Sequence, residues 1–185
     1  MGALCSCCKD KPRETSLDEK LERKIAEMKR YIIGESKLKS IDSVVMLFPM
    51  FKEKLKPLRG MFEKYDLDSN GSIEPNELKR FLEHQQLRLQ EQEIDNIFQF
   101  CDIDGSKGIQ FNEFIALLCL IHLLTTPASS NSLAHLGPTF DRMVEVFLFF
   151  DQNGHEEMDR DKNGNVTFRE FLFGFINWIG IDADE

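Results

Sequence analysis

Residues 66–77 read Asp-Leu-Asp-Ser-Asn-Gly-Ser-Ile-Glu-Pro-Asn-Glu, and this stretch decides the fold. A hard cation such as Ca²⁺ takes about 6–8 oxygen ligands at roughly 2.3–2.6 Å. The spacing supplies these oxygens from the side chains of Asp66, Asp68 and Asn70, the carbonyl of Ser72, a water held by Glu74 and both carboxylate oxygens of Glu77. Gly71 permits the sharp turn that a side chain would resist, and Ile73 is expected to pair with a neighbouring loop. The stretch therefore predicts a cation-binding loop rather than an ordinary acidic turn.

A second loop of the same layout runs from Asp102 to Glu113. Its side chains at the alternate positions are Asp102, Asp104 and Ser106, its ninth residue is Gln110, and Ile109 stands in register with Ile73. Lys107 departs from the pattern, because it replaces the turn glycine, and a left-handed lysine costs roughly 1–2 kcal/mol. We expect weaker or slower Ca²⁺ binding here than at the first loop. The alternative is a second loop with a purely structural role.

A third loop runs from Asp159 to Glu170 and follows the pattern as closely as the first. The residues in register are Asp159, Asp161, Asn163, Gly164, Asn165, Val166, Thr167 and Glu170. Residues 151–154 look like the opening of another loop that breaks off, so we interpret them as a truncated unit. The alternative is one helix with a short insertion, and both interpretations predict an ion at the third loop and none at Asp151. Val166 then lacks an intact partner loop, which predicts a C-terminal lobe that is loose or that dimerises.

The three loops together resemble the EF-hand calcium-binding superfamily. The chain looks most like plant calmodulin-like proteins with an extended, acylated amino terminus. The resemblance covers about residues 57–180 and implies an all-α fold, made of helix-loop-helix pairs with short β-bridges, and Ca²⁺ as the bound ion. Carried over position by position, it implies ligation by Asp66, Asp68, Asn70, Ser72 and Glu77, by Asp102, Asp104, Ser106, Gly108 and Glu113, and by Asp159, Asp161, Asn163, Asn165 and Glu170.

Helical periodicity places further elements around the loops. A capping-box pattern at residues 16–19 predicts a helix that ends near Gly34, and a second helix is expected over Ile41–Phe48, before Pro49. We expect these helices to pack on the body, because an apolar stripe needs cover; the alternative is a partner-binding arm. The predicted segments are a flexible acylated tail (1–15), an N-terminal helical extension (16–56), paired EF-hands (57–125), a linker (126–137), and a C-terminal EF-hand preceded by a truncated hand (138–185).

The amino terminus, Met-Gly-Ala-Leu-Cys-Ser, matches the pattern for N-myristoylation at Gly2. One myristoyl chain holds a membrane only marginally, and palmitate on Cys5, Cys7 or Cys8 would supply a second anchor. The alternatives are a cysteine metal site, for which no histidine lies near, and an inert tail. This predicts a protein at the cytoplasmic face of a membrane, with the plasma membrane favoured, and in the cytosol.

The 185 residues carry a net charge of −9, which argues against nucleic acid as a partner. The apolar run 114–124 is too short to span a bilayer. We find no nucleophile elbow, phosphate loop or zinc pair, so an enzyme is not expected. The favoured function is a membrane-anchored calcium sensor that exposes Phe- and Met-lined apolar surface to target proteins. The alternatives are a calcium buffer and a calcium-binding regulatory subunit of an enzyme.

Overall fold

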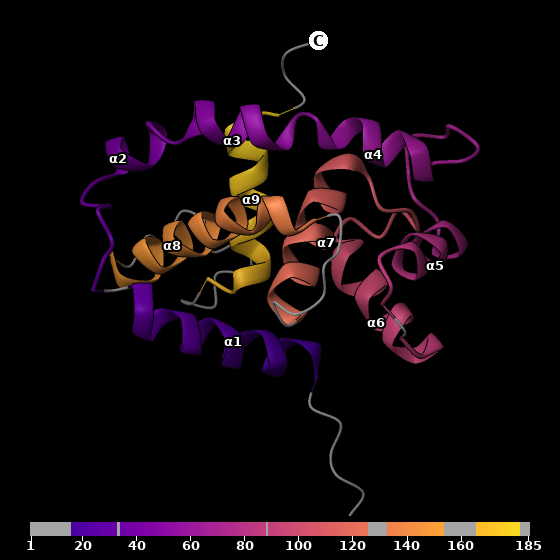
Figure 1. Ribbon diagram of the computed structural model, residues 1–185, viewed down its shortest axis with the longest axis horizontal. Coiled ribbons are helices and arrows are strands. Elements are labelled where there is room, and N and C mark those ends of the chain that lie inside the picture. The colour runs from indigo at the N-terminus through magenta and orange to yellow at the C-terminus, as the bar shows by residue number, and fades with distance from the viewer. Residues whose placement is uncertain (1–15, 33, 88, 126–132, 154–165, 182–185) are drawn as a thin grey trace, which may run out of the picture.

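The computed structural model describes residues 16–32, 34–87, 89–125, 133–153 and 166–181, and helices make up most of this part of the chain (Figure 1). The predicted all-α EF-hand fold is confirmed. Two helix-loop-helix units lie side by side, and they are formed by α4 (Leu58–Tyr65), α5 (Pro75–His84), α6 (Glu91–Cys101) and α7 (Phe111–Leu124). α5 begins at Pro75, whose fixed φ and missing N–H suit the first turn of a helix.

The predicted bridge between the two loops is present. Ile73 and Ile109 form an antiparallel β-bridge, in which each backbone N–H donates to the other residue's carbonyl oxygen at 2.8 and 2.9 Å. Both side chains are fully buried. The bridge joins the two loops at their eighth residues, so the loops form one unit rather than two independent turns.

The N-terminal extension packs on the body, as expected, but its helices differ from the prediction. α1 (Leu17–Ile32) contacts α7 and α8 (Gly137–Asn153), and α3 (Phe48–Leu55) contacts α4 and α9 (Phe168–Ile179). The single helix expected over Ile41–Phe48 is wrong. α2 (Ile41–Val45) ends early, and α3 begins at Phe48 with Pro49 in its first turn, where proline favours a helix start.

Two polar contacts fasten the extension to α8. The Ser36 hydroxyl donates to Glu145 Oε1 at 2.7 Å, and this glutamate is buried beside Arg142. Lys29 Nζ lies 3.1 Å from Asp151 Oδ2. Asp151, the first residue of the truncated loop motif, thus lies in the last turn of α8 and forms an ion pair with Lys29 of α1.

The linker predicted over 126–137 is partly wrong. Residues 126–132 lie outside the described part of the chain, but residues 134–136 form the 3₁₀ helix η1 (Ala134–Leu136), and Gly137 begins α8. Leu133 and Leu136 are buried, so their burial against the body overrides the loop-like composition of the surrounding residues.

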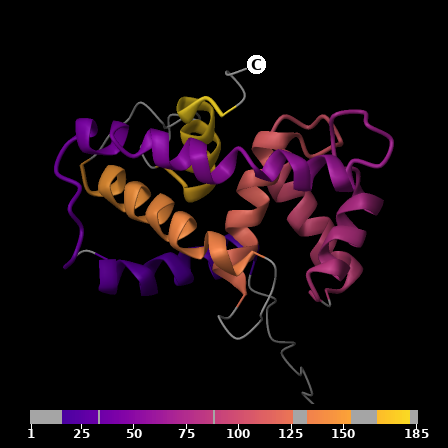
Figure 2. The same cartoon turned by 45° about the horizontal axis from the view of Figure 1, so that its top comes forward.

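α7 is the central element of the fold. It is buried on nearly every side and contacts α1, α4, α6, α8 and α9 (Figures 1 and 2). A helix that is apolar all round is a core helix, which matches the buried helix expected from the run 114–124. In the described residues we find no helix that is both long enough and apolar enough to cross a membrane.

The C-terminal helix obtains its cover within the chain. α9 packs on α7, α8 and α3, and the side chains of Phe171 and Phe175 are fully buried. The ring centroids of Phe175 and Phe51 lie 5.4 Å apart in an edge-on arrangement. The ring centroids of Phe48 and Trp178 lie 4.8 Å apart. The loose lobe or dimer predicted from the missing partner loop of Val166 stays a prediction, but α9 itself packs against helices of the same chain.

Candidate calcium sites

The first loop connects α4 to α5 and gathers three carboxylates. Oxygen atoms of Asp66, Asp68 and Glu77 all lie within 4.8 Å of one another. Asp66 directly follows α4, and Glu77 is the third residue of α5. The two ends of the loop therefore place ligands on the two helices whose relative angle a bound ion would set.

Backbone N–H groups orient these carboxylates. Asp66 accepts from Asn70 N at 3.1 Å and from Gly71 N at 2.9 Å, through different oxygens. Glu77 Oε1 accepts from Leu67 N at 2.8 Å, and its Oε2 accepts from Glu74 N at 2.9 Å. A carboxylate oxygen has a second lone pair, so each oxygen can hold its N–H donor and still face a cation.

The second loop folds in the same way, between α6 and α7. Oxygens of Asp102, Asp104 and Glu113 lie within 4.8 Å of one another. Glu113 accepts from Ile103 N and from Gln110 N, both at 2.9 Å. Asp102 accepts through different oxygens from the N–H groups of the fifth and sixth loop residues, both at 3.0 Å. The second loop thus reproduces the backbone pattern that holds the first.

Both loops turn through two left-handed residues, the fourth and the sixth. In the first loop these are Ser69, with φ 55°, and Gly71, with φ 84°. In the second loop they are Gly105 and Lys107, both with φ 67°. The expected left-handed lysine is confirmed, but the first loop carries a non-glycine residue of its own at the fourth position. Backbone strain alone therefore does not make the second loop the weaker site.

Gly108 has a role that the sequence did not reveal. A Cβ added there would lie 2.4 Å from Ser72 Oγ and 2.7 Å from Ser72 Cβ. The two seventh residues of the loops therefore approach too closely for any side chain at Gly108. The signal in the sequence was a glycine directly before the bridge residue Ile109.

Some predicted ligand oxygens are shared with neighbours inside the loops. Asn70 Oδ1 accepts from the N–H and the hydroxyl of Ser72, both at 2.8 Å. The Ser106 hydroxyl donates to the Gly108 carbonyl at 2.9 Å, and Gln110 Nε2 donates to Asp104 Oδ2 at 2.8 Å. Ion binding at either loop must share or replace such bonds.

Comparison with known proteins identifies the family. A family model described as an EF-hand domain pair matches residues 55–119. A probable calcium-binding protein of Arabidopsis thaliana, CML22, is 41% identical over 223 residues, which cover 98% of this chain and 97% of that relative. Another, CML21, is 36% identical over 220 residues, which cover 100% and 95%. The chain belongs to the calmodulin-like proteins. It binds calcium as a member of this family, and Ca²⁺ is the ion expected at its loops.

More distant matches include Calcium-dependent protein kinase 22 of the same plant, which is 25% identical and matches over 26% of its own length. The two alignments with the calmodulin-like relatives span more positions than the 185 residues of this chain. Both relatives therefore carry residues that this calmodulin-like chain lacks.

The donor set of this calmodulin-like chain fits Ca²⁺. All the predicted ligands offer oxygen, which suits a large hard cation. Burial raises the pKa of Glu113; the N–H groups of Gln110 and Ile103 oppose this shift, and the charges of Asp104 and Asp102 add to it. Bound Ca²⁺ would supply the positive charge that this carboxylate cluster needs. At the rim, hydrogen bonds from Ser106 lower the pKa of Asp104.

The third loop is described only from Val166 onward, so Asp159, Asp161, Asn163 and Asn165 lie outside the described residues. Its twelfth residue is placed like those of the other loops. Thr167 N donates to Glu170 Oε2 at 3.0 Å, and Glu170 N donates to Thr167 Oγ1 at 3.3 Å. This capping box, between the ninth and twelfth residues, recurs in all three loops. The Thr-x-x-Glu pattern could have predicted it.

Proposed function

We propose that this calmodulin-like chain is a calcium sensor in which the paired loops act on α7. The observation that carries the proposal is the position of Glu113. It is a predicted ligand of the second loop, and it is also the third residue of α7, against which α1, α4, α6, α8 and α9 pack. A shift of the Glu113 side chain on ion binding would therefore move α7, the helix that most of the other helices contact.

The bridge between Ile73 and Ile109 supports a coupled response. It joins the loops by two short backbone hydrogen bonds. A change in the backbone of one loop would therefore move the backbone of the other loop. Glu77 occupies in α5 the position that Glu113 occupies in α7. The two exit helices can therefore move together, and the apolar side chains between them are the surface that a partner protein would meet.

The test combines a count of ions with a measure of exposed apolar surface. Calorimetric titration with Ca²⁺ is run on the wild type, Glu77→Gln and Glu113→Gln, beside fluorescence of a dye that binds apolar surface. We expect each variant to lose one site and part of the dye response. A full set of bound ions with no rise in dye fluorescence would contradict a sensor.

A specific observation favours the second candidate, a calcium buffer. Glu77 and Glu113 already lie within their carboxylate clusters, each held by two backbone donors. An ion could then bind with little movement of α5 or α7. The dye experiment separates the two candidates, because a buffer would bind the ions without exposing apolar surface.

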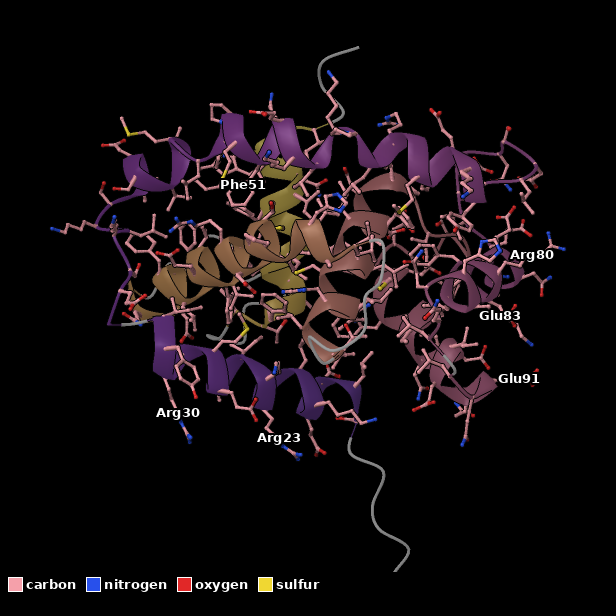
Figure 3. The ribbon with its side chains drawn as sticks, viewed as in Figure 1. Arg23, Arg30, Phe51, Arg80, Glu83 and Glu91 are labelled. Atoms are coloured by element: carbon pink, nitrogen blue, oxygen red, sulfur yellow. The ribbon has the colours of Figure 1, made fainter. Side chains whose placement is uncertain are left out.

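We further propose that the chain is anchored to a membrane through Gly2 and one or more of Cys5, Cys7 and Cys8. These residues lie outside the described part of the chain. Support comes from the exposed position of Ser16 and from the side chains of Arg23 and Arg30, which point away from the body on α1 (Figure 3). Cationic side chains beside a lipid anchor add attraction to anionic lipid. A Gly2→Ala variant is expected to leave the membrane fraction, and retention there would contradict the anchor.

The likeness to calcium-dependent protein kinases supports a related possibility, a regulatory role toward an enzyme. The kinases match this chain over about a quarter of their own length. Co-purification with a kinase only in the presence of Ca²⁺ would support this role, and equal recovery with a chelator would oppose it.

A further inference from the structure

α1 concentrates its positive charge on one flank. Side chains three and four residues apart lie next to one another on a helix surface, and six of them form a continuous stripe along α1. The residues of this basic stripe are Lys20, Arg23, Lys24, Glu27, Arg30 and Tyr31. It holds four cations and one acid, in a protein whose net charge is −9. Arg23 and Arg30 point away from the body (Figure 3), so the stripe faces outward.

The fold uses few of these charges. Lys24 Nζ lies 3.6 Å from Glu27 Oε2, but Lys20, Arg23 and Arg30 form no ion pair with any other described residue. Lys29, on the opposite flank of α1, is instead paired with α8. Exposed cations without partners add little to stability. The basic stripe is therefore available to an anionic partner.

A hollow of about 220 Å³ opens beside the stripe, between α1 and the C-terminal end of α7. The residues that line it are Lys20, Arg23, Lys24 and Glu27 on α1, and Leu123, Leu124 and Thr125 at the end of α7. One wall thus offers cations and the other offers leucine side chains. A free phosphate would meet only the cations, whereas a phospholipid would place its headgroup against one wall and the start of its acyl chains against the other.

The competing interpretation is purely structural. Cations near the C-terminal end of a helix stabilise its dipole, so the stripe would serve α7 alone. The end of α7 already has a cap of its own, because the hydroxyl and the N–H of Thr125 donate to the Ile121 carbonyl at 2.8 and 2.9 Å. Arg30 lies ten residues beyond Lys20 along α1 and does not line the hollow at the end of α7. The structural interpretation therefore leaves the far part of the stripe unexplained.

Both ends of the stripe carry features that suit a membrane surface. At one end, the Tyr31 side chain is 79% exposed, and tyrosine is enriched at the interface between membrane and water. The other end lies just after residues 1–15, which carry the proposed lipid anchor at Gly2. An anchored tail would hold the stripe at high effective concentration beside the headgroups.

We propose that the basic stripe of α1 is a binding site for anionic phospholipid. The headgroup phosphate binds among Lys20, Arg23 and Lys24, and the start of the acyl chains lies beside Leu123 and Leu124. The inference rests on the membrane location proposed above, but the binding itself does not depend on which acyl group the tail carries. Since a single acyl chain holds a membrane only marginally, the stripe adds the second attraction and selects a leaflet by its negative charge.

The experiment supplies the anchor chemically, so that it tests the stripe alone. In the full chain with Cys7→Ser and Cys8→Ser, a thiol-reactive lipid is attached to Cys5. Cys101 and Cys119 are buried and do not compete for it. Sedimentation with vesicles of phosphatidylcholine, with and without phosphatidylserine, measures binding in the presence of a chelator, because free Ca²⁺ itself binds phosphatidylserine.

The test variant is Lys20→Gln/Arg23→Gln/Arg30→Gln. The matched control is Lys54→Gln/Lys56→Gln/Arg80→Gln, which changes the net charge equally at exposed positions on other parts of the fold. Arg80 lies on α5, well away from Arg23 and Arg30 (Figure 3). Urea denaturation of each variant reports whether the cations serve stability.

We expect the unsubstituted lipid-bearing chain to prefer the serine-containing vesicles and to lose this preference at high salt. Arg23→Gln should weaken binding to these vesicles about fivefold and the triple variant about a hundredfold, whereas binding to phosphatidylcholine alone and binding by the control variant should stay unchanged. Equal losses in the test and control variants would overturn the inference, as would a test variant that is less stable but keeps its preference. Binding of polyglutamate by a chain without lipid preference would assign the stripe to an acidic protein and also overturn it. The anchor is tested separately, by the location of Gly2→Ala in cells.

Discussion

The close approach of the two loops gives the sharpest prediction. A Gly108→Ala variant places a methyl group 2.4 Å from Ser72 Oγ and 2.7 Å from Ser72 Cβ. The hydroxyl can rotate away, but the Cβ is fixed to the backbone of the first loop. The loops must therefore separate, and the bridge between Ile73 and Ile109 must lengthen.

The expected cost follows from these distances. Inserting a methyl group into a tightly packed site costs about 1–3 kcal/mol, and loss of one of the two bridge hydrogen bonds would add about 1 kcal/mol. We expect Gly108→Ala to lower the free energy of unfolding by about 2–4 kcal/mol, as measured by urea denaturation with a chelator present. Ca²⁺ titration should show weaker binding at both loops, because the bridge is shared.

A rescue experiment tests the cause. Ser72→Gly removes both clashing atoms, so the double variant should recover most of the lost stability, whereas Ser72→Ala keeps the Cβ and should recover little. Gly105→Ala is the matched control: it has open space around its Cβ but a φ of 67°, so its cost should be about 1 kcal/mol and should not respond to Ser72→Gly. A Gly108→Ala variant as stable as the wild type, or a double variant without rescue, would refute the reasoning.

Other perturbations have distinct expected results. Lys107→Gly should raise the free energy of unfolding by about 1 kcal/mol, since it relieves a left-handed lysine; no gain in urea denaturation would contradict this. The raised pKa of Glu113 means that, without Ca²⁺, its contribution to stability is fully present below its unfolded pKa and is lost as pH rises through the folded value. Ca²⁺ needs the ionised form, so binding should release protons in mildly acidic buffer, and the heat of binding should vary with the buffer's ionisation heat. Ser36→Ala should lower the free energy of unfolding by about 1–2 kcal/mol, because it removes a hydrogen-bond donor from buried Glu145. The exposed ion pair of Lys29 with Asp151 should contribute about 0.5 kcal/mol or less to the free energy of unfolding.

Local spacing predicted the loops well. The alternate carboxylates, the isoleucine pair and the proline at the start of α5 each depend on a few neighbouring residues, and the structure places them as expected. The helix predicted to end before Pro49 is wrong because proline also suits the first turn of a helix, and Pro49 lies in the first turn of α3.

The features that the sequence did not predict depend on contacts between segments far apart in the chain. The need for a glycine at Gly108 arises from Ser72 in another loop, and the burial of Leu133 overrides its loop-like neighbours. The cover of α9 could not be predicted either, because the apolar pattern of residues 168–179 shows that the helix needs a partner but not that α7 and α3 provide it.

Trp178 offers the most direct test of the sensor account, because it is the single tryptophan in the chain and packs beside Phe48 of α3. Its emission is recorded during Ca²⁺ titration of the wild type, Glu113→Gln and a Glu77→Gln/Glu113→Gln double variant. The account predicts that Ca²⁺ shifts the emission in the wild type and that the shift shrinks in both variants, although the substitutions lie in the hand pair and the tryptophan in α9. An emission that stays constant while calorimetry records bound Ca²⁺, or a shift of equal size in all three proteins, would contradict it.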